Sequence, residues 1–181
     1  RALGRGASRG LGRAVAEGLL AEGVEVIAVS RNAKTIQDWA KDAPGLTALS
    51  ADLSDLASVD ALIAAVLAKG GVDILVNNSG GPAPGGAATA SRGDWLVQFE
   101  SMAANLFHLT AQLLPGMRSR KWGRVVTIAS AGVEQPIPNL ALSNGIRAAV
   151  VGWSKTLAAE VAAEGVTVNI VMPGRIQTTR V

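Results

Sequence analysis

The sequence predicts an α/β fold in three layers, in which helices cover both faces of a doubly wound parallel sheet. Short apolar strand patterns alternate with amphipathic helix patterns along all 181 residues, and this alternation is typical of a parallel sheet. No internal repeat, low-complexity tract or polar linker interrupts it. The chain 1–181 is therefore expected to form a single domain.

The composition narrows the class of protein. Hydrophobic residues make up 49% of the chain and charged residues 17%, which is typical of a soluble protein with a filled core. With no cysteine and one histidine, no metal site is expected. The net charge is +3 and no basic cluster surrounds the few aromatic residues, so nucleic acid is not an expected partner. Because the chain has no apolar run of membrane-spanning length and no secretory signal, we expect no membrane contact and a cytoplasmic location.

The first element is a glycine-rich turn between a short apolar strand and a helix. Gly6, Gly10 and Gly12 form a GxxxGxG pattern, and four arginines flank it, at positions 1, 5, 9 and 13. Glycine adopts backbone angles closed to other residues and leaves room for a pyrophosphate, and a helix N-terminus attracts anions. One interpretation is therefore a dinucleotide site. The other is a turn that packs a helix on a strand without any ligand.

The second expected strand, residues 24–29, ends in residues that bear on the choice of cofactor. In a dinucleotide-binding fold, an acidic residue at this point binds the hydroxyl groups of the adenosine ribose. The sequence instead has Ser30 and Arg31, and a positive charge here suits a 2′-phosphate. With Arg9, these residues favour NADP over NAD, and an exposed loop arginine without a ligand is the alternative.

The later elements continue the alternation. In chain order we expect a short helix at 36–40, a strand at 46–49, a helix at 56–67, a strand at 72–76, a long helical pattern at 94–120, a strand at 124–128, a helix at 140–164 and a strand at 166–171. Pro115 is expected to kink or break the long helix. Because only residues 1–5 remain for the first strand and the chain stops soon after the sixth, we expect that both ends are cut.

The order of the polar signals makes the pattern specific. Asp52 follows the third strand, Asn-Asn-Ser-Gly at 77–80 follows the fourth, Asn105 lies in the next helix, Ser130 follows the fifth strand and Pro173 the sixth. Together with the glycine turn, this order resembles the short-chain dehydrogenase/reductase family and its branch of 3-oxoacyl-acyl-carrier-protein reductases. The resemblance covers essentially the whole chain and implies a Rossmann-type fold, whose lid and last strand would lie beyond residue 181.

The resemblance implies which residues surround the dinucleotide. Asp52 and Leu53 would flank the adenine, the run 77–80 would line the cofactor channel, and Pro173 would lie by the nicotinamide. The residues expected to bind the cofactor are Gly6, Ser8, Arg9, Gly10, Leu11, Gly12, Ser30, Arg31, Asp52, Leu53, Asn78, Ser79, Gly80, Arg147, Pro173 and Gly174.

The resemblance also implies a catalytic set, from which this sequence departs. In the family a Tyr protonates the carbonyl oxygen, a Lys four residues later lowers the pKa of that Tyr and binds the nicotinamide ribose, a Ser polarises the carbonyl, and an Asn holds a proton-relay water. Ser130 and Asn105 match the last two roles. The Tyr and Lys positions fall on Ser143 and Arg147, and the chain contains no Tyr. Ser143 and Arg147 still share one helical face.

A second departure lies in the first strand. Gly4 and Arg5 stand where the family has an apolar residue and a Thr. An arginine buried beside the sheet is costly without a partner. The alternative is that Arg5 turns towards the phosphates.

Three functions remain open at this point. The first is an NADP-dependent reductase of a ketone or 3-oxoacyl substrate, in which Ser130 polarises the carbonyl, Arg147 clamps the cofactor, and Ser143 or water delivers the proton. The second is a nucleotide-binding subunit without turnover, and the third is a scaffold that binds neither cofactor nor substrate. A homodimer or tetramer is expected through the helices at 94–120 and 140–164, with apolar contacts from Val150, Val151, Trp153 and Leu157.

Overall fold

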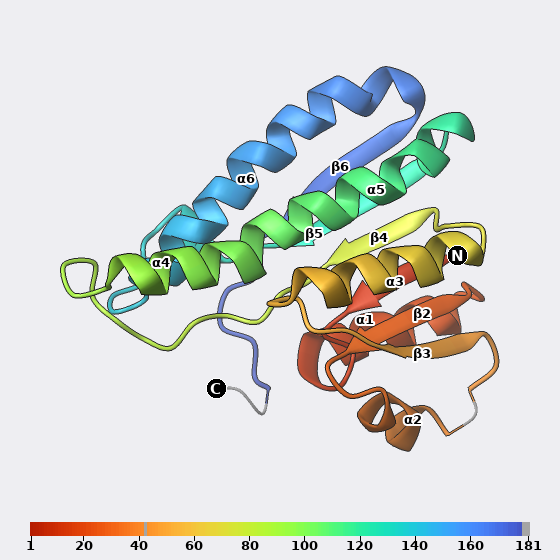
Figure 1. Cartoon of the computed structure of the whole chain (residues 1–181), viewed down its shortest axis with the longest axis horizontal. Helices are drawn as coiled ribbons and strands as arrows, with labels where there is room; N and C mark the ends of the chain where they lie inside the picture. Colours follow the sequence, from red (N-terminus) through yellow and green to blue (C-terminus); the bar gives the residue numbers. More distant parts are fainter. Residues whose placement is uncertain (42, 179–181) are drawn as a thin grey trace.

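The six strands of the sheet run parallel, in the spatial order β3-β2-β1-β4-β5-β6 (Figure 1). The computed structural model describes residues 1–41 and 43–178. The strands are β1 (Ala2–Arg5), β2 (Val26–Ser30), β3 (Leu46–Ser50), β4 (Ile74–Asn77), β5 (Gly123–Ile128) and β6 (Val166–Val171). The strand order reverses between β1 and β4, so the expected doubly wound α/β class is confirmed.

The helices form two layers, one on each face of the sheet (Figure 1). They are α1 (Gly10–Ala21), α2 (Lys34–Ala40), α3 (Leu56–Ala68), α4 (Arg92–Phe99), α5 (Asn105–Ser119) and α6 (Ala141–Val161), with short 3₁₀ turns at Ala131–Val133 and Ala162–Glu164. One core cluster joins α1 and α2 to the sheet, and a larger one joins α3, α5 and α6 to the opposite face. Within the part of the chain that is described, no helix is both long and apolar enough to cross a bilayer.

Strand β2 shows why this sheet could be recognised from its sequence. Val26 and Ala28 belong to the cluster under α1 and α2, whereas Ile27 and Val29 belong to the cluster under α3 and α5. Successive side chains of a strand point to opposite faces, and both faces of this sheet are covered. The strand must therefore be apolar at every one of these positions, as it is.

The long helical segment is interrupted in a different place from the one expected. A π-helical turn, η1 (Glu100–Ala104), separates α4 from α5, and α5 continues through Pro115 without a break. The helix therefore does not break at Pro115, and a kink there stays a prediction. Proline removes one hydrogen bond from the helix, but Leu114 and Met117 on either side of it are buried in the main core and hold the last turns in place.

Apolar residues of helix α6 pack against other parts of the same chain. Val150 and Val151 are 4% and 6% exposed, the Trp153 ring stacks on Phe107 with 4.3 Å between ring centroids, and Leu157 packs against the main core. Val150 and Val151 are therefore used in the core, whereas Trp153 and Leu157 stay half-buried, and their contact with another subunit stays a prediction.

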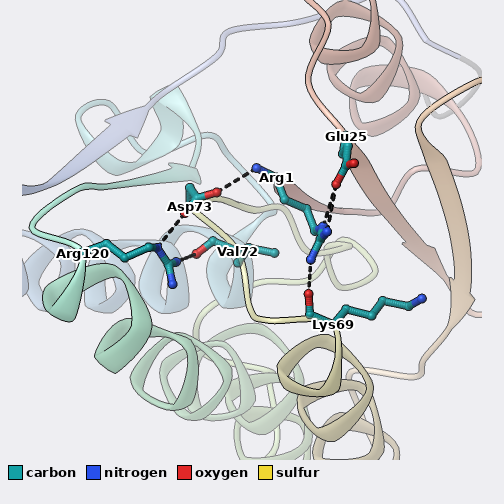
Figure 2. A network of polar contacts seen from close by, with 6 residues as sticks. All are labelled: Arg1, Glu25, Lys69, Val72, Asp73 and Arg120. Carbon is teal, nitrogen blue, oxygen red and sulfur yellow. Dashed lines mark hydrogen bonds and ion pairs between the residues drawn. The ribbon is translucent and has the colours of Figure 1, made fainter.

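A polar network closes the edge of the sheet at which the strands begin (Figure 2). Arg120 Nε lies 2.9 Å from one carboxylate oxygen of Asp73, and Arg120 Nη2 donates to the Val72 carbonyl at 2.9 Å. The amino group of Arg1 contacts the other Asp73 oxygen at 2.8 Å, and the Arg1 guanidinium pairs with Glu25. The polar turns predicted to form a site all lie at the opposite edge, where the strands end.

Candidate active site

Two hydrogen bonds connect the glycine-rich turn to β2 and α2. Ala7 N–H donates to the Val29 carbonyl at 3.1 Å, and Trp39 Nε1–H donates to the Ala7 carbonyl at 3.0 Å. Gly6 and Gly10 have positive φ of 69° and 55°, which favours glycine at both positions. Helix α1 starts without a side-chain cap from the described residues, so its first N–H groups can bind an anion. The Trp39 contact escaped sequence reasoning, because it depends on how α2 packs.

Gly12 is required where α1 touches this turn. A Cβ at position 12 would lie 2.3 Å from the Gly6 carbonyl oxygen, whereas a Cβ at Gly18 of the same helix would meet nothing within 4 Å. We expect Gly12→Ala to lower the free energy of unfolding by about 1–3 kcal/mol, and Gly18→Ala to raise it by about 0.5–1 kcal/mol. Urea unfolding of the two variants measures the difference. Equal midpoints would contradict the contact.

The adenosine end of the expected site lies where β2 and β3 end. Ser30 pairs with Ser50 across the two strands, and the Ala51 N–H donates to the Ser30 carbonyl at 3.0 Å. The backbone N–H and the hydroxyl of Ser54 both donate to Asp52, and these bonds hold the pKa of Asp52 below its ordinary value, with a smaller contribution from the charge of Arg31. The structure therefore brings Ser30, Arg31 and Asp52 to one corner of the sheet.

Arg5 is buried under α5 rather than turned towards the glycine-rich turn. It is 1% exposed, and its Nη2 donates to Asn77 Oδ1 at 3.0 Å, while Asn77 Nδ2 donates to Thr110 Oγ1 of α5 at 3.1 Å. Nε and Nη1 have no partner among the described residues, and burial lowers the pKa of Arg5 to about 10. Asn78 Nδ2 also donates to the Arg5 carbonyl, at 3.3 Å. The alternative in which the Arg5 side chain faces the phosphates is therefore wrong.

Removing the buried charge of Arg5 is expected to stabilise the fold. Arg5→Gln retains an N–H donor for Asn77 and should raise the free energy of unfolding by about 1–3 kcal/mol, because an unpaired buried cation costs more than a buried amide. The matched control is Lys34→Gln, which removes an exposed cation paired with Asp38 and should change stability by less than about 0.5 kcal/mol. Urea unfolding measures both changes. A less stable Arg5→Gln protein would contradict the expectation.

Ser143 and Arg147 of α6 lie beside the end of β5, next to Ser130. Arg147 Nη1 donates to the carbonyls of Ile128 and Ala129 at 3.0 and 3.1 Å, and Arg147 Nε lies 3.3 Å from Ser143 Oγ. Arg147 Nη2 donates to the Gly80 carbonyl at 3.1 Å. The guanidinium thus bridges the ends of β4 and β5 through backbone carbonyls. A cation held there favours the charged form of any acidic group beside it.

Ser130 and the segment after β6 complete this region. Ser130 Oγ accepts a hydrogen bond from Gly132 N–H at 3.1 Å, and Ala131 N–H donates to the Pro173 carbonyl at 3.0 Å. Further along, the Thr178 side chain lies against the glycine-rich turn, 3.4 Å from where a Cβ of Gly10 would stand. The segment after β6 therefore runs from the Ser130 region towards the start of α1.

Asn105, which sequence reasoning placed beside a proton-relay water, has a protein partner on another side. It is 4% exposed and its Nδ2 donates to the Leu53 carbonyl at 2.8 Å. The preceding π-turn packs Met102 against Ile146 of α6, whereas Asn105 and His108 both reach towards α3, with His108 2.7 Å from Asp60. No hydrogen bond that we identify among the described residues joins Asn105 to Ser130, Ser143 or Arg147. Its part in a proton relay stays a prediction.

Comparison with known proteins adds to this geometry. The family model described as short chain dehydrogenase matches residues 2–181. The chain is 39% identical over 183 residues to the 3-oxoacyl-[acyl-carrier-protein] reductase FabG of Salmonella typhimurium, covering 98% of this chain and 73% of that protein. It is 38% identical over 181 residues to FabG of Escherichia coli, with the same coverage.

Solved structures resemble the chain over nearly its whole length. An actinorhodin polyketide ketoreductase variant with NADPH superposes with a TM-score of 0.91 at 34% identity, covering 99% of this chain and 71% of that one. L-Sorbose reductase from Gluconobacter frateurii, complexed with NADPH and L-sorbose, superposes with a TM-score of 0.93 at 32% identity, covering 99% and 70%. Both comparisons extend across the strand ends at which the predicted site residues lie.

Proposed function

This chain belongs to the short-chain dehydrogenase family, and on that premise we propose that it is an oxidoreductase that uses NADPH to reduce a ketone or 3-oxoacyl substrate. The observation that carries the proposal is the group formed by Ser130, Ser143 and Arg147 at the end of β5, in which the guanidinium lies between Ser143 and the backbone next to Ser130. The relatives named 3-oxoacyl-[acyl-carrier-protein] reductase support the substrate class.

The strand ends carry the residues that we propose to bind a dinucleotide. Gly6 has a positive φ of 69°, and a Cβ there would also lie 2.8 Å from Asn78 Nδ2, so this position of the turn favours glycine. We propose that residues 6–12 bind the phosphates, and that Arg9 and Arg31 bind the 2′-phosphate of NADP. Asp52 and Leu53 would flank the adenine, residues 78–80 would line the channel, and residues 173–174 would lie by the nicotinamide. Two similar structures that contain NADPH support this choice of cofactor.

The proposed reaction adds a hydride to the carbonyl carbon and a proton to the carbonyl oxygen, which yields an alcohol. NADPH, when bound, supplies the hydride and is left as NADP⁺. The Ser130 hydroxyl donates a hydrogen bond to the substrate oxygen and stabilises the negative charge that develops there. The proton comes from Ser143 or from a water beside the Arg147 guanidinium, whose charge favours release of the proton. Because a serine hydroxyl is a far weaker acid than a phenol, this step is expected to be slow.

Loss of NADPH absorbance with a panel of ketones and 3-oxoacyl thioesters tests the proposal. Ser130→Ala is expected to lower kcat about 10²–10³-fold, the usual cost of removing one hydrogen bond to a developing oxyanion. Ser119→Ala is the control, because the Ser119 hydroxyl caps a carbonyl at the far end of α5, and its turnover should equal that of the wild type. A protein that binds NADPH but turns over no substrate in the panel would contradict the proposal.

The absence of any tyrosine favours a second candidate function, a nucleotide-binding subunit without turnover. It predicts NADPH binding by calorimetry without oxidation of NADPH, and activity only when an intact homologue is added. A scaffold that binds neither cofactor nor substrate is a third candidate. Any micromolar affinity for NADPH would exclude the scaffold.

We also propose a homodimer or tetramer formed through the helical segments 94–120 and 140–164. Helix α4 has no buried residue, and its Leu96, Val97 and Phe99 are 52%, 58% and 40% exposed. Large apolar side chains grouped on one short helix support a contact with another copy. Light scattering that finds a monomer would contradict this assembly.

A further inference from the structure

The loop between β3 and α3, residues 51–55, is anchored to two neighbouring helices. On one side, the Asp52 N–H donates to Ser58 Oγ of α3 at 3.0 Å, and Asp55 caps α3 by accepting from the Ala57 N–H at 3.1 Å. On the other side, the Leu53 carbonyl accepts from Asn105 Nδ2 at 2.8 Å. The bond from Asn105 spans 52 residues of sequence and connects the loop to the first residue of α5.

The surroundings of the Asn105 side chain restrict the direction of its amide group. Its side chain is buried, and it points towards α3 together with His108 one turn later. The side of the helical segment that faces α6 carries Met102 of the π-turn, which belongs to one cluster with Ile146 and Val150. The amide is therefore directed at the loop and not at the group formed by Ser130, Ser143 and Arg147.

We infer that Asn105 is a positioning residue that fixes the Asp52–Leu53 loop for the adenine half of the dinucleotide. This inference rests on the proposed function, which places these two loop residues beside the adenine. Without the amide, the Leu53 carbonyl loses its hydrogen-bond donor, and the loop must shift or take up water to satisfy it. The cofactor would then have to order the loop when it binds, and its affinity would fall. We expect this positioning role in place of the proton relay that the resemblance implied, so that loss of the Asn105 amide leaves the chemical step unaffected.

Binding measurements with each half of the cofactor distinguish this positioning role from a catalytic role. Calorimetry on the full chain would measure the dissociation constants of NADPH, of 2′-phospho-ADP-ribose, which carries the adenine, and of reduced nicotinamide mononucleotide, which does not. We expect Asn105→Ala to weaken NADPH and 2′-phospho-ADP-ribose by about tenfold each, the effect of losing one buried hydrogen bond. Affinity for the mononucleotide, and kcat at saturating NADPH, should stay within about twofold of the wild type.

The matched control is His108→Ala, which removes the neighbouring contact to Asp60 of α3 and leaves the loop bond intact; all three affinities should remain those of the wild type. Asn105→Ser, a smaller polar residue, is measured as well in case the alanine variant unfolds, and it should show the same selective loss.

A fall in kcat with unchanged affinity for 2′-phospho-ADP-ribose would overturn the inference and return Asn105 to the reacting centre. Unchanged affinities in both variants would also overturn it. If the wild type itself bound neither NADPH nor 2′-phospho-ADP-ribose, the proposed function would fail first and the inference with it.

Discussion

Replacing Arg147 with alanine is expected to lower kcat/KM by about 10³-fold or more, since the guanidinium is both a charge and a structural bridge in the proposed site. It bonds to the carbonyls of Ile128, Ala129 and Gly80 and lies beside Ser143. Without it, the ends of β4 and β5 lose their shared donor, and Ser130 loses the support of the adjacent backbone. Steady-state kinetics with NADPH and the best substrate of the panel measure the loss.

Two controls separate the chemistry of Arg147 from general damage to α6. Lys155→Ala removes an exposed cation two turns further along the same helix and should leave kcat/KM unchanged. Arg147→Lys keeps the charge but cannot reach three carbonyls with a fixed fork of donors, so an intermediate loss is expected. If Arg147→Ala retained kcat/KM within threefold of the wild type, the guanidinium would have no role in turnover.

Introducing the missing phenol is expected to speed the reaction. Ser143→Tyr should raise kcat about 10²–10⁴-fold, the usual contribution of a well-placed general acid. A tyrosine at this position would lie one helical turn from Arg147, and the neighbouring cation would lower the pKa of the phenol from its ordinary value of about 10. The acid must be protonated to act, so the rate should fall as the pH rises through that lowered pKa.

The ring without its hydroxyl is the control for this gain. Ser143→Phe fills the same space but cannot donate a proton, so its kcat should not exceed that of the wild type. Equal rates for the tyrosine and phenylalanine variants would show that the acid does not limit turnover. No turnover in any variant, with NADPH still bound, would favour the nucleotide-binding subunit instead.

Much of the fold could be predicted because its determinants are local. A parallel strand buried on both faces must be apolar throughout, and this marks β2 from Val26 to Val29. Strand β6 alternates apolar and polar residues at the edge of the sheet, and its predicted range of 166–171 matches the structure. Of the kink or break expected at Pro115, the break does not occur, because burial elsewhere in the helix opposes it. The local rule counts one lost hydrogen bond, but burial of Leu114 and Met117 outweighs that cost.

In the candidate site, as in the fold, the sequence predicts local features but not contacts between distant residues. The spacing of Ser143 and Arg147 on one helix is a local property, and their approach to Ser130 follows because parallel strands end at the same edge of the sheet. The partners of Arg5, Trp39 and Asn105 lie 72, 32 and 52 residues away in the sequence. No spacing or propensity encodes contacts of this kind.

The sequence by itself determined the elements, their alternation and the residues at each strand end, because these depend on backbone propensity and on the period of apolar residues. Only the tertiary structure decided which neighbour each side chain meets: that Arg5 lies under α5, and that the Asn105 amide reaches the Leu53 loop instead of the Ser130 region. The physical reason is that strand order and helix packing are set by burial summed over the whole core, so the direction of one polar side chain follows from residues far along the chain.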